Sequence, residues 1–205
     1  MKDKGLLIAF EGIDGSGKTT QVEILKQALN IVGLKVNVFK EPTNSEYGQE
    51  IKRLSREGRG DSRKELNLFI EDRKWDVENN ILPALSKKEI VIMDRYYYSN
   101  AAYQTIYGND TASEILWRNE NQFPKPDITL LLDIAPIIGI TRIQNRRKEK
   151  LNAFEDIQDL QKVRQEFLKI AARDSHIQVI DGSKPVGSIA EQIYNIVECF
   201  FTKDY

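Results

Sequence analysis

A glycine-rich segment near the start of the chain has the residues and the spacing of a loop that binds nucleotide phosphates. It matches Gly-x4-Gly-Lys-Ser/Thr from Gly12 to Thr19, between an apolar run and a segment with helical spacing of apolar residues. Glycines let backbone N–H groups converge on phosphate oxygens, and the N-terminus of the following helix adds partial positive charge. In such a loop Lys18 reaches the β- and γ-phosphates, and the Thr19 hydroxyl binds Mg²⁺. The predicted ATP-binding residues of the loop are Gly12, Ile13, Asp14, Gly15, Ser16, Gly17, Lys18, Thr19 and Thr20.

An aspartate–arginine pair at the end of another apolar run is the second candidate for phosphate chemistry. Asp94 follows residues 90–93, at a position where a carboxylate can hold the hydration shell of Mg²⁺. Arg95 can bind a second phosphate group through two parallel hydrogen bonds. The structural alternative is an aspartate that caps the next helix. Because a phosphate loop lies upstream, we favour a metal site at Thr19 and Asp94, with Lys18, Asp94 and Arg95 as catalytic residues.

A basic run covers residues 142–150. A solvated helix face is the ordinary explanation of such a run. A phosphate-loop kinase, however, needs an arginine-bearing lid that closes over the phosphates, excludes water and neutralises charge in the transition state. We therefore expect a lid segment at about residues 143–155.

Phe69 and Arg73 are four residues apart, so they share one face of a helix. An aromatic ring beside a guanidinium can stack on a base and hydrogen-bond its edge. The spacing alone favours a structural explanation instead, in which Phe69 belongs to the core and Arg73 pairs with Glu71 or Asp76. The tyrosines at 96, 97, 98 and 103 are likewise expected to be packing residues.

Composition limits the classes of function. The 205 residues fit one domain, and 30 basic against 31 acidic residues provide no overall field for a nucleic-acid or membrane partner. One histidine and one cysteine exclude a disulfide within the chain and leave too few ligands for a zinc site. We expect a cytoplasmic protein without a membrane span, and Cys199 as a small buried residue.

Apolar runs alternate with amphipathic segments along the whole chain, which predicts a parallel sheet covered on both faces. The expected fold class is α/β, with a three-layer α/β/α phosphate-loop NTPase fold and a five-stranded parallel sheet. Ligands of such folds bind at the carboxyl ends of the strands, where Asp14, Glu41, Asp94 and Arg95 fall. The expected strands are 6–10, 35–39, 90–93, 128–133 and 177–180, and the expected helices are about 18–32, 48–57, 63–85, 97–104, 110–121, 135–146, 155–172 and 186–201.

Taken together, these motifs resemble the thymidylate kinase family from Phe10 to about Val197. The similar segments are the phosphate loop through Gln21, the Glu41–Pro42 turn, the Phe-x-x-x-Arg spacing of Phe69 and Arg73, the Asp94-Arg95-Tyr96…Ala102-Tyr103-Gln104 signature, and Pro126-Asp127 with Leu132-Asp133. The resemblance implies transfer of the γ-phosphoryl group of ATP to dTMP, which gives dTDP and ADP in dTTP synthesis. It also implies Mg²⁺ as cofactor, a single domain over residues 1–205 and a homodimer.

The resemblance implies roles for the residues that contact the nucleoside. Phe69 stacks on thymine, Arg73 hydrogen-bonds its exocyclic oxygen, and Asn100 reads the edge of the base. Tyr103 packs against the deoxyribose where a 2′-hydroxyl would clash, and Asp14 accepts the 3′-hydroxyl.

The acceptor phosphate is held by Arg95 and, by the same resemblance, by a basic residue of the second helix. In many relatives this residue is arginine, and here it is Lys52 or its neighbour Arg53. The complete implied dTMP-binding set is Asp14, Glu41, Lys52, Phe69, Arg73, Arg95, Asn100, Tyr103 and Gln104.

The chain departs from the family pattern at several positions. Gly15 follows Asp14, so the loop has no arginine, and the resemblance implies that Arg146 or Arg147 supplies the catalytic arginine from the lid. Arg142, at the start of the basic run, is assigned to ATP. In addition, Ala153 and Lys40 stand where relatives often have arginine.

Two other functions stay open. One is a kinase for a different nucleoside monophosphate or nucleoside, and the other is a nucleotide-binding module with little turnover. A GTPase would need an Asn-Lys-x-Asp motif after a strand, and the sequence has none.

Overall fold

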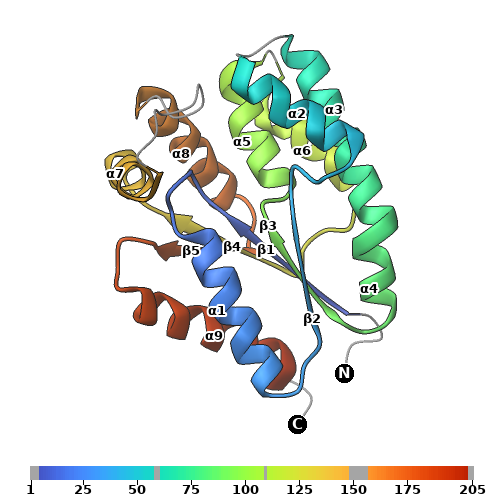
Figure 1. Ribbon diagram of the computed structural model, residues 1–205, viewed down its shortest axis with the longest axis vertical. Coiled ribbons are helices and arrows are strands. Elements are labelled where there is room, and N and C mark those ends of the chain that lie inside the picture. The colour runs from blue at the N-terminus through green and yellow to red at the C-terminus, as the bar shows by residue number, and fades with distance from the viewer. Residues whose placement is uncertain (1–4, 58–60, 109, 148–156, 203–205) are drawn as a thin grey trace.

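Five parallel strands form the centre of the fold, in the order β2-β3-β1-β4-β5 (Figure 1). The structure is a computed structural model that describes residues 5–57, 61–108, 110–147 and 157–202. The predicted five-stranded parallel sheet is confirmed. The strands are β1 (Leu6–Glu11), β2 (Val36–Lys40), β3 (Ile90–Asp94), β4 (Ile128–Asp133) and β5 (Ile177–Asp181).

Helices cover both faces of this sheet, which confirms the three-layer arrangement. Side chains alternate along β1, so that Leu7 and Ala9 enter one core while Leu6, Ile8 and Phe10 enter the other. The second core is closed by α1 (Lys18–Ile31) and α9 (Val186–Thr202), as Figure 1 shows. The first core is closed by α3 (Ser62–Asp76), η1 (Val77–Ile81), α4 (Leu82–Ser86), α5 (Tyr97–Tyr107), α6 (Ala112–Glu120), α7 (Pro136–Arg147) and α8 (Ile157–Ala171). The remaining helix, α2 (Glu46–Glu57), packs on α3.

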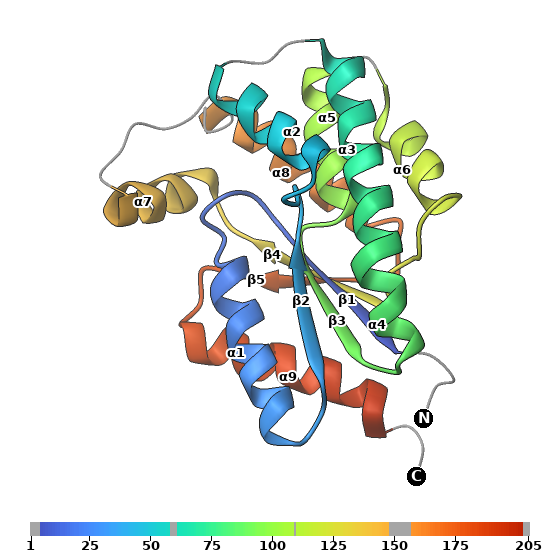
Figure 2. The same ribbon diagram turned by 45° about the vertical axis from the view of Figure 1, so that its right-hand side comes forward.

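The long helix predicted over residues 63–85 is interrupted. Figure 2 shows α3 and α4 following one another along the same side of the sheet, and a π-helical turn, η1, lies between them. In η1 the N–H of Leu82 bonds to the carbonyl of Val77, five residues back. Pro83 has no N–H for the carbonyl four residues before it, so the wider turn is favoured there. Pro83 therefore lies at the start of α4, the short helix that ends this helical run at Ser86.

Cys199 is exposed, which corrects the expectation of a buried thiol. The buried side of α9 carries Ile189, Ile193 and Val197, spaced four residues apart. Cys199 is two positions beyond Val197, and two positions on a helix are about 200° of rotation, so its side chain faces away from the core.

Within the described residues, every helix is either too short or too polar to cross a membrane.

Asp174 fixes the position of α5, the helix that carries much of the predicted site. It lies between α8 and β5 and accepts a hydrogen bond from the Tyr98 hydroxyl at 2.7 Å. Lys125 Nζ lies 3.0 Å from the same carboxylate. Burial opposes ionisation, but the hydrogen bonds from Tyr98, His176 and Lys125 outweigh it and lower the pKa of Asp174 to about 2.

Asp174→Asn is expected to lower the Tm at pH 7, because the amide cannot replace the charge that these donors bind. The folded pKa lies below the ordinary value of 3.8, so the stabilisation is complete above about pH 4 and is lost as the pH falls toward 2. Thermal melts from pH 7 to pH 2 should therefore show the two proteins converging at low pH. Glu191→Gln, at an exposed position of α9, is the control. A Tm difference that is the same at pH 7 and pH 2 would contradict this role.

Candidate active site

The phosphate loop connects β1 to α1, and its glycines have backbone conformations that other residues rarely adopt. Gly12 and Gly15 have φ of 136° and 76°. A Cβ atom at Gly12 would lie 2.5 Å from the Leu132 carbonyl oxygen, and one at Gly15 would lie 2.3 Å from that of Gly139. The loop can therefore pack against the end of β4 and against α7 only with glycine at both positions.

Lys18 is folded into this loop. Its Nζ donates hydrogen bonds to the carbonyls of Gly12 and Ile13, both at 3.0 Å. Burial, and then the nearby charge of Arg95, lower the pKa of Lys18 to about 7. A phosphate group in the loop would favour the charged lysine, so the surroundings of Lys18 suit an anionic ligand.

Thr19 and Asp94 meet at the end of β3. The Thr19 hydroxyl donates to Asp94 Oδ2 at 2.7 Å, and Lys40 Nζ lies 3.2 Å from the same oxygen. Burial opposes ionisation of Asp94, but Lys18, Lys40 and the Thr19 hydrogen bond hold its pKa below the usual range. Among the described residues, Asp94 Oδ1 is buried without a hydrogen-bond partner. An ionised carboxylate with a free oxygen beside a hydroxyl fits Mg²⁺, which prefers oxygen ligands.

Arg95 connects this loop to the neighbouring pocket. Its Nη1 donates to the Gly12 carbonyl at 3.0 Å and to Ser99 Oγ at 2.8 Å, and its Nη2 donates to Asp14 Oδ1 at 2.6 Å. Burial opposes ionisation of Asp14, but the charges of Arg95 and Lys18 lower its pKa. One guanidinium is thus held at the border between the phosphate loop and the base pocket.

The residues predicted to bind dTMP lie together. All nine line one cavity of about 170 Å³, between the phosphate loop, α2, α3 and α5. Pro42, Ile51 and Tyr96 contribute apolar surface to the same cavity. Within the described chain, both amide atoms of Asn100 and Oε1 of Gln104 are buried without a hydrogen-bond partner. Such atoms are the ones that a bound base could satisfy.

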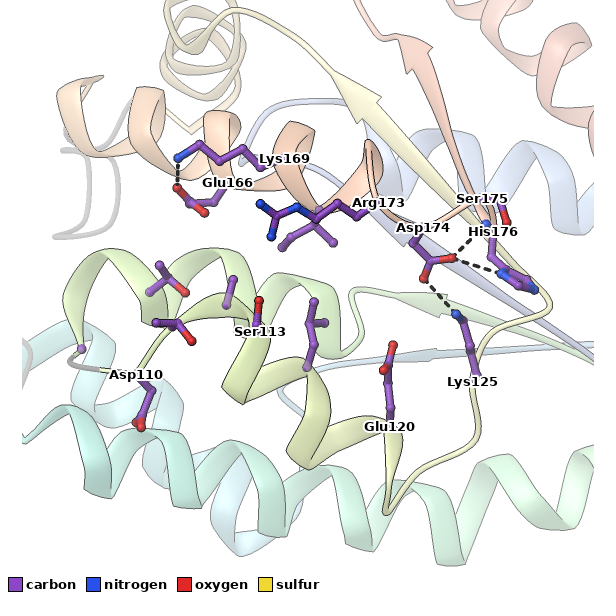
Figure 3. A pocket seen from close by; sticks show the side chains of 16 residues that line it. Asp110, Ser113, Glu120, Lys125, Glu166, Lys169, Arg173, Asp174, Ser175 and His176 are labelled. Carbon is purple, nitrogen blue, oxygen red and sulfur yellow. Dashed lines mark hydrogen bonds and ion pairs between the residues drawn. The ribbon is translucent and has the colours of Figure 1, made fainter.

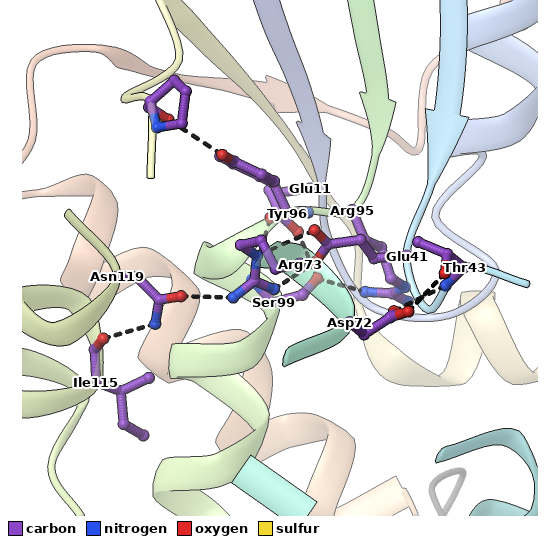
Figure 4. Close-up of polar contacts among 11 residues, drawn as sticks. Glu11, Glu41, Thr43, Asp72, Arg73, Arg95, Tyr96, Ser99, Ile115 and Asn119 are labelled. Carbon is purple, nitrogen blue, oxygen red and sulfur yellow. Dashed lines mark hydrogen bonds and ion pairs between the residues drawn. The ribbon is translucent and has the colours of Figure 1, made fainter. Parts of the chain in front are cut away.

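Arg73 lines this cavity, and Figure 4 shows its guanidinium between Glu41 and Asn119. Its Nε donates to Glu41 Oε1 at 3.0 Å, its Nη2 donates to Glu41 Oε2, and its Nη1 donates to Asn119 Oδ1 at 2.5 Å. The sequence suggested Glu71 or Asp76 as structural partners, and the structure shows Glu41 instead. Only 1% of Arg73 is exposed, so the residue is both a core residue and part of the cavity wall.

The structure distinguishes Lys52 from Arg53. Lys52 lines the cavity and donates to the Thr43 carbonyl at 2.6 Å. Arg53 is on the outer side of α2, where it pairs with Glu50 and Glu57. The basic residue that faces the cavity is therefore Lys52.

Asp72 holds the loop that precedes α2. Its carboxylate accepts hydrogen bonds from the Thr43 N–H at 2.8 Å, the Thr43 hydroxyl at 2.5 Å and the Ser45 hydroxyl at 2.6 Å. Because the Thr43 carbonyl in turn binds Lys52, this carboxylate fixes one wall of the cavity.

Arg142 lies against the phosphate loop. Its Nη2 donates to the Gly182 carbonyl at 3.0 Å, and its Nη1 donates to the Gly15 carbonyl at 3.3 Å. The side chains of Arg146 and Arg147, and residues 148–155 of the predicted lid, are outside the described part of the structure.

A larger cavity of about 800 Å³ lies apart from this site, between α5, α6 and α8 (Figure 3). Both acidic and basic side chains line it, with Lys169 2.6 Å from Glu166 and Lys125 3.0 Å from Asp174. His176 is exposed at its edge and contacts Asp174, in agreement with a structural role.

Four residues that shape the site were missed by the sequence analysis: Asp72, Ser99, Asn119 and Glu11. The carboxylate of Glu11 accepts hydrogen bonds from the Tyr96 N–H at 2.9 Å and from the Ser99 hydroxyl. Two of the four had a detectable signal, since Glu11 is a charge that ends an apolar run and Asp72 directly precedes Arg73. Ser99 and Asn119 are ordinary helix-surface residues by type, and only their burial identifies them.

Comparisons with known proteins point to one family. The family model described as Thymidylate kinase matches residues 10–193. A protein named Probable thymidylate kinase from Archaeoglobus fulgidus is 46% identical over 195 residues, which are 95% of this chain and 96% of the relative. Proteins named Thymidylate kinase from Xanthomonas euvesicatoria and Leptospira interrogans are each 39% identical, over 96% and 94% of this chain and 85% and 94% of their own lengths.

The buried pair of Glu41 and Arg73 should be far more important for stability than an exposed pair of the same chemistry. Glu41→Ala is expected to lower the free energy of unfolding by roughly 3–5 kcal/mol, because it leaves a buried guanidinium without its counter-charge. The matched control is Glu50→Ala, which removes the exposed partner of Arg53 and should change stability little. Urea unfolding of both variants checks this, and equal effects would argue against a buried ion pair.

Proposed function

The chain belongs to the thymidylate kinase family, and on that premise we propose that the site described above transfers the γ-phosphoryl group of ATP to dTMP. The products of this dTMP kinase reaction are dTDP and ADP. The observation that carries the assignment is the position of Arg95. Its guanidinium donates a hydrogen bond to the Gly12 carbonyl of the phosphate loop, and its side chain lines the same cavity as the other eight predicted dTMP-binding residues. Donor and acceptor phosphates would therefore meet at one guanidinium.

The transfer needs positioning more than acid–base chemistry. A phosphate oxygen of dTMP attacks the γ-phosphorus of ATP, a P–O bond forms, and the bond to the β,γ-bridging oxygen breaks, so that ADP leaves with the electron pair. The attacking oxygen is already ionised near neutral pH, and a strong general base is unnecessary. Lys18 and Arg95 neutralise charge that shifts between the two phosphates.

Thr19 and Asp94 would hold Mg²⁺, Thr19 through its hydroxyl and Asp94 through its ionised carboxylate. When bound, the ion neutralises charge on the β- and γ-phosphate oxygens. Lys40, 3.2 Å from Asp94, keeps this carboxylate ionised before the ligand arrives.

The cavity lining supports the nucleoside roles. Phe69 provides an aromatic face for thymine, Arg73 hydrogen-bonds its exocyclic oxygen, and Asn100 and Gln104 offer unpaired amide atoms to the base. Tyr103 is packed edge-on against Phe167, with ring centroids 6.3 Å apart, so its ring makes a firm wall for the sugar.

The lid, the domain organisation and the assembly belong to the same proposal. Residues 1–205 form one kinase domain, and a lid at about 143–155 supplies Arg146 or Arg147 to the transferring phosphoryl group, with Arg142 at the ATP. The chain acts as a homodimer in the cytoplasm. The dimer is supported by exposed apolar side chains on three helices that share one side of the molecule in Figures 1 and 2: Trp75 on α3, Leu82 on α4 and Trp117 on α6.

The reaction is tested by ADP release with Mg·ATP and a panel of dTMP, dUMP, dCMP, dGMP, UMP and thymidine. We expect turnover that strongly prefers dTMP, and we expect Lys18→Ala to lower kcat by about 10³-fold with the fold intact. Turnover that prefers another acceptor would support a kinase reaction but would contradict the proposed thymine-binding site. ATP binding without acceptor-dependent turnover would favour a nucleotide-binding module.

Tyr103 should exclude ribonucleotides by its bulk. Tyr103→Phe keeps the ring, and we expect it to leave the preference for dTMP over ribothymidine monophosphate nearly unchanged. Tyr103→Ala should lower this preference by about 10-fold. The ratio of kcat/KM for the two acceptors is the measurement. If Tyr103→Ala keeps the sugar preference of the parent enzyme, the ring does not select the sugar.

A further inference from the structure

Asn119 lies outside the cavity, behind Arg73. It is the next-to-last residue of α6 and is completely buried. Its Oδ1 accepts a hydrogen bond from Arg73 Nη1 at 2.5 Å, and its Nδ2 donates to the Ile115 carbonyl at 2.7 Å (Figure 4). The second bond determines the orientation of the amide, because a flipped side chain would place an oxygen against the Ile115 carbonyl and an N–H group against Arg73.

The contacts of Arg73 show what this amide contributes. A guanidinium has five N–H bonds, and the described residues accept three of them. Glu41 takes the edge formed by Nε and Nη2, and such a pair can still pivot about the carboxylate. Asn119 binds the opposite corner, Nη1, and a third point of attachment prevents this rotation. Among the described residues, one N–H bond on each Nη is left without an acceptor, and the side chain that carries them lines the cavity.

Aromatic rings complete the support of the guanidinium. Arg73 Cζ lies 5.3 Å from the ring centroid of Tyr96 and 5.7 Å from that of Phe123. Phe123 follows α6 directly, and its N–H bonds to the Asn119 carbonyl at 2.9 Å. The end of α6 therefore provides both a hydrogen-bond acceptor and an aromatic wall for a residue on α3.

We propose that Asn119 is a positioning residue for base recognition, which holds the free N–H bonds of Arg73 toward the 4-oxo group of the pyrimidine. This inference rests on the proposed function, since it assigns Arg73 to the thymine oxygen. Asn119 thereby helps the enzyme to prefer a 4-oxo base over a 4-amino base without touching either one. The relevant competitor of dTMP is dCMP, whose amino group donates where thymine accepts.

The test compares two asparagines near the end of the same helix. Asn119→Ala removes both the bond to Ile115 and the acceptor for Arg73. Asn121→Ala removes an equivalent bond, from Nδ2 to the Trp117 carbonyl at 2.7 Å, on the exposed side of the helix end. Values of kcat/KM for dTMP and dCMP and of KM for ATP are measured for the parent and both variants.

Asn119→Ala is expected to lower kcat/KM for dTMP by about 10-fold, because Nη1 of the buried Arg73 loses its acceptor and the guanidinium can pivot on Glu41 away from the base. The ratio of kcat/KM for dTMP to kcat/KM for dCMP should fall by a similar factor, while KM for ATP stays within twofold of the parent value. Asn121→Ala should match the parent. Equal losses for dTMP and dCMP, or an unchanged ratio, would overturn the role.

Two further comparisons are included, a replacement variant in case Asn119→Ala does not fold and a double variant with Arg73→Ala. If Asn119→Ala does not fold, Asn119→Ser replaces it, since a helical serine hydroxyl can bond to the Ile115 carbonyl while leaving Nη1 without an acceptor. The same loss of selectivity is then expected. In an Arg73→Ala background, Asn119→Ala should change the ratio no further, and an additional loss would show that Asn119 acts independently of Arg73. A parent enzyme without dTMP turnover would instead refute the proposed function, and the two failures are therefore distinguishable.

Discussion

The geometry of the site depends on the buried carboxylate of Glu11, which joins the end of β1 to the first turn of α5. Its Oε1 accepts the Tyr96 N–H at 2.9 Å and the Ser99 N–H at 3.1 Å, and its Oε2 accepts the Ser99 hydroxyl. A helix leaves its first N–H groups unpaired, and here a strand supplies the cap. Because the Ser99 hydroxyl donates its hydrogen bond to Glu11, its oxygen is free to accept a hydrogen bond from Arg95. One carboxylate thus aligns the phosphate loop, the acceptor arginine and the helix that carries Asn100.

The parallel sheet makes this alignment possible. In its register, Phe10 lies opposite Asp94, and Asp94 lies opposite Lys40, so three strand ends bring their polar residues to one edge. The buried charges there are satisfied by partners from distant parts of the chain. Glu41, just after β2, is paired in this way with Arg73 of α3. Hydrogen bonds between distant segments hold these side chains in fixed relative positions, which is what positioning catalysis requires.

Features that depend on local sequence were predictable. The phosphate loop, the Asp94–Arg95 pair and the alternation of strands and helices follow from spacing alone, and the structure reproduces all five predicted strands within a residue or two. Arg73 was ambiguous because helical spacing is the same for a core residue and for a residue that lines a cavity. Its partners, Glu41 and Asn119, are 32 and 46 residues away, and such pairings depend on tertiary packing that periodicity does not encode. The π-helical turn and the exposure of Cys199 were not predicted for a similar reason, since both depend on how a helix packs against the core.

The most direct measurement is a crystal structure of the chain with dTMP and Mg·ADP bound. We expect thymine stacked on Phe69 with its 4-oxo group hydrogen-bonded to Arg73, the dTMP phosphate on Arg95, and the β-phosphate of ADP in the loop beside Lys18. This expectation would be contradicted by dTMP in the cavity between α6 and α8, or by a nucleotide in the cavity beside Arg73 with its base directed away from that guanidinium.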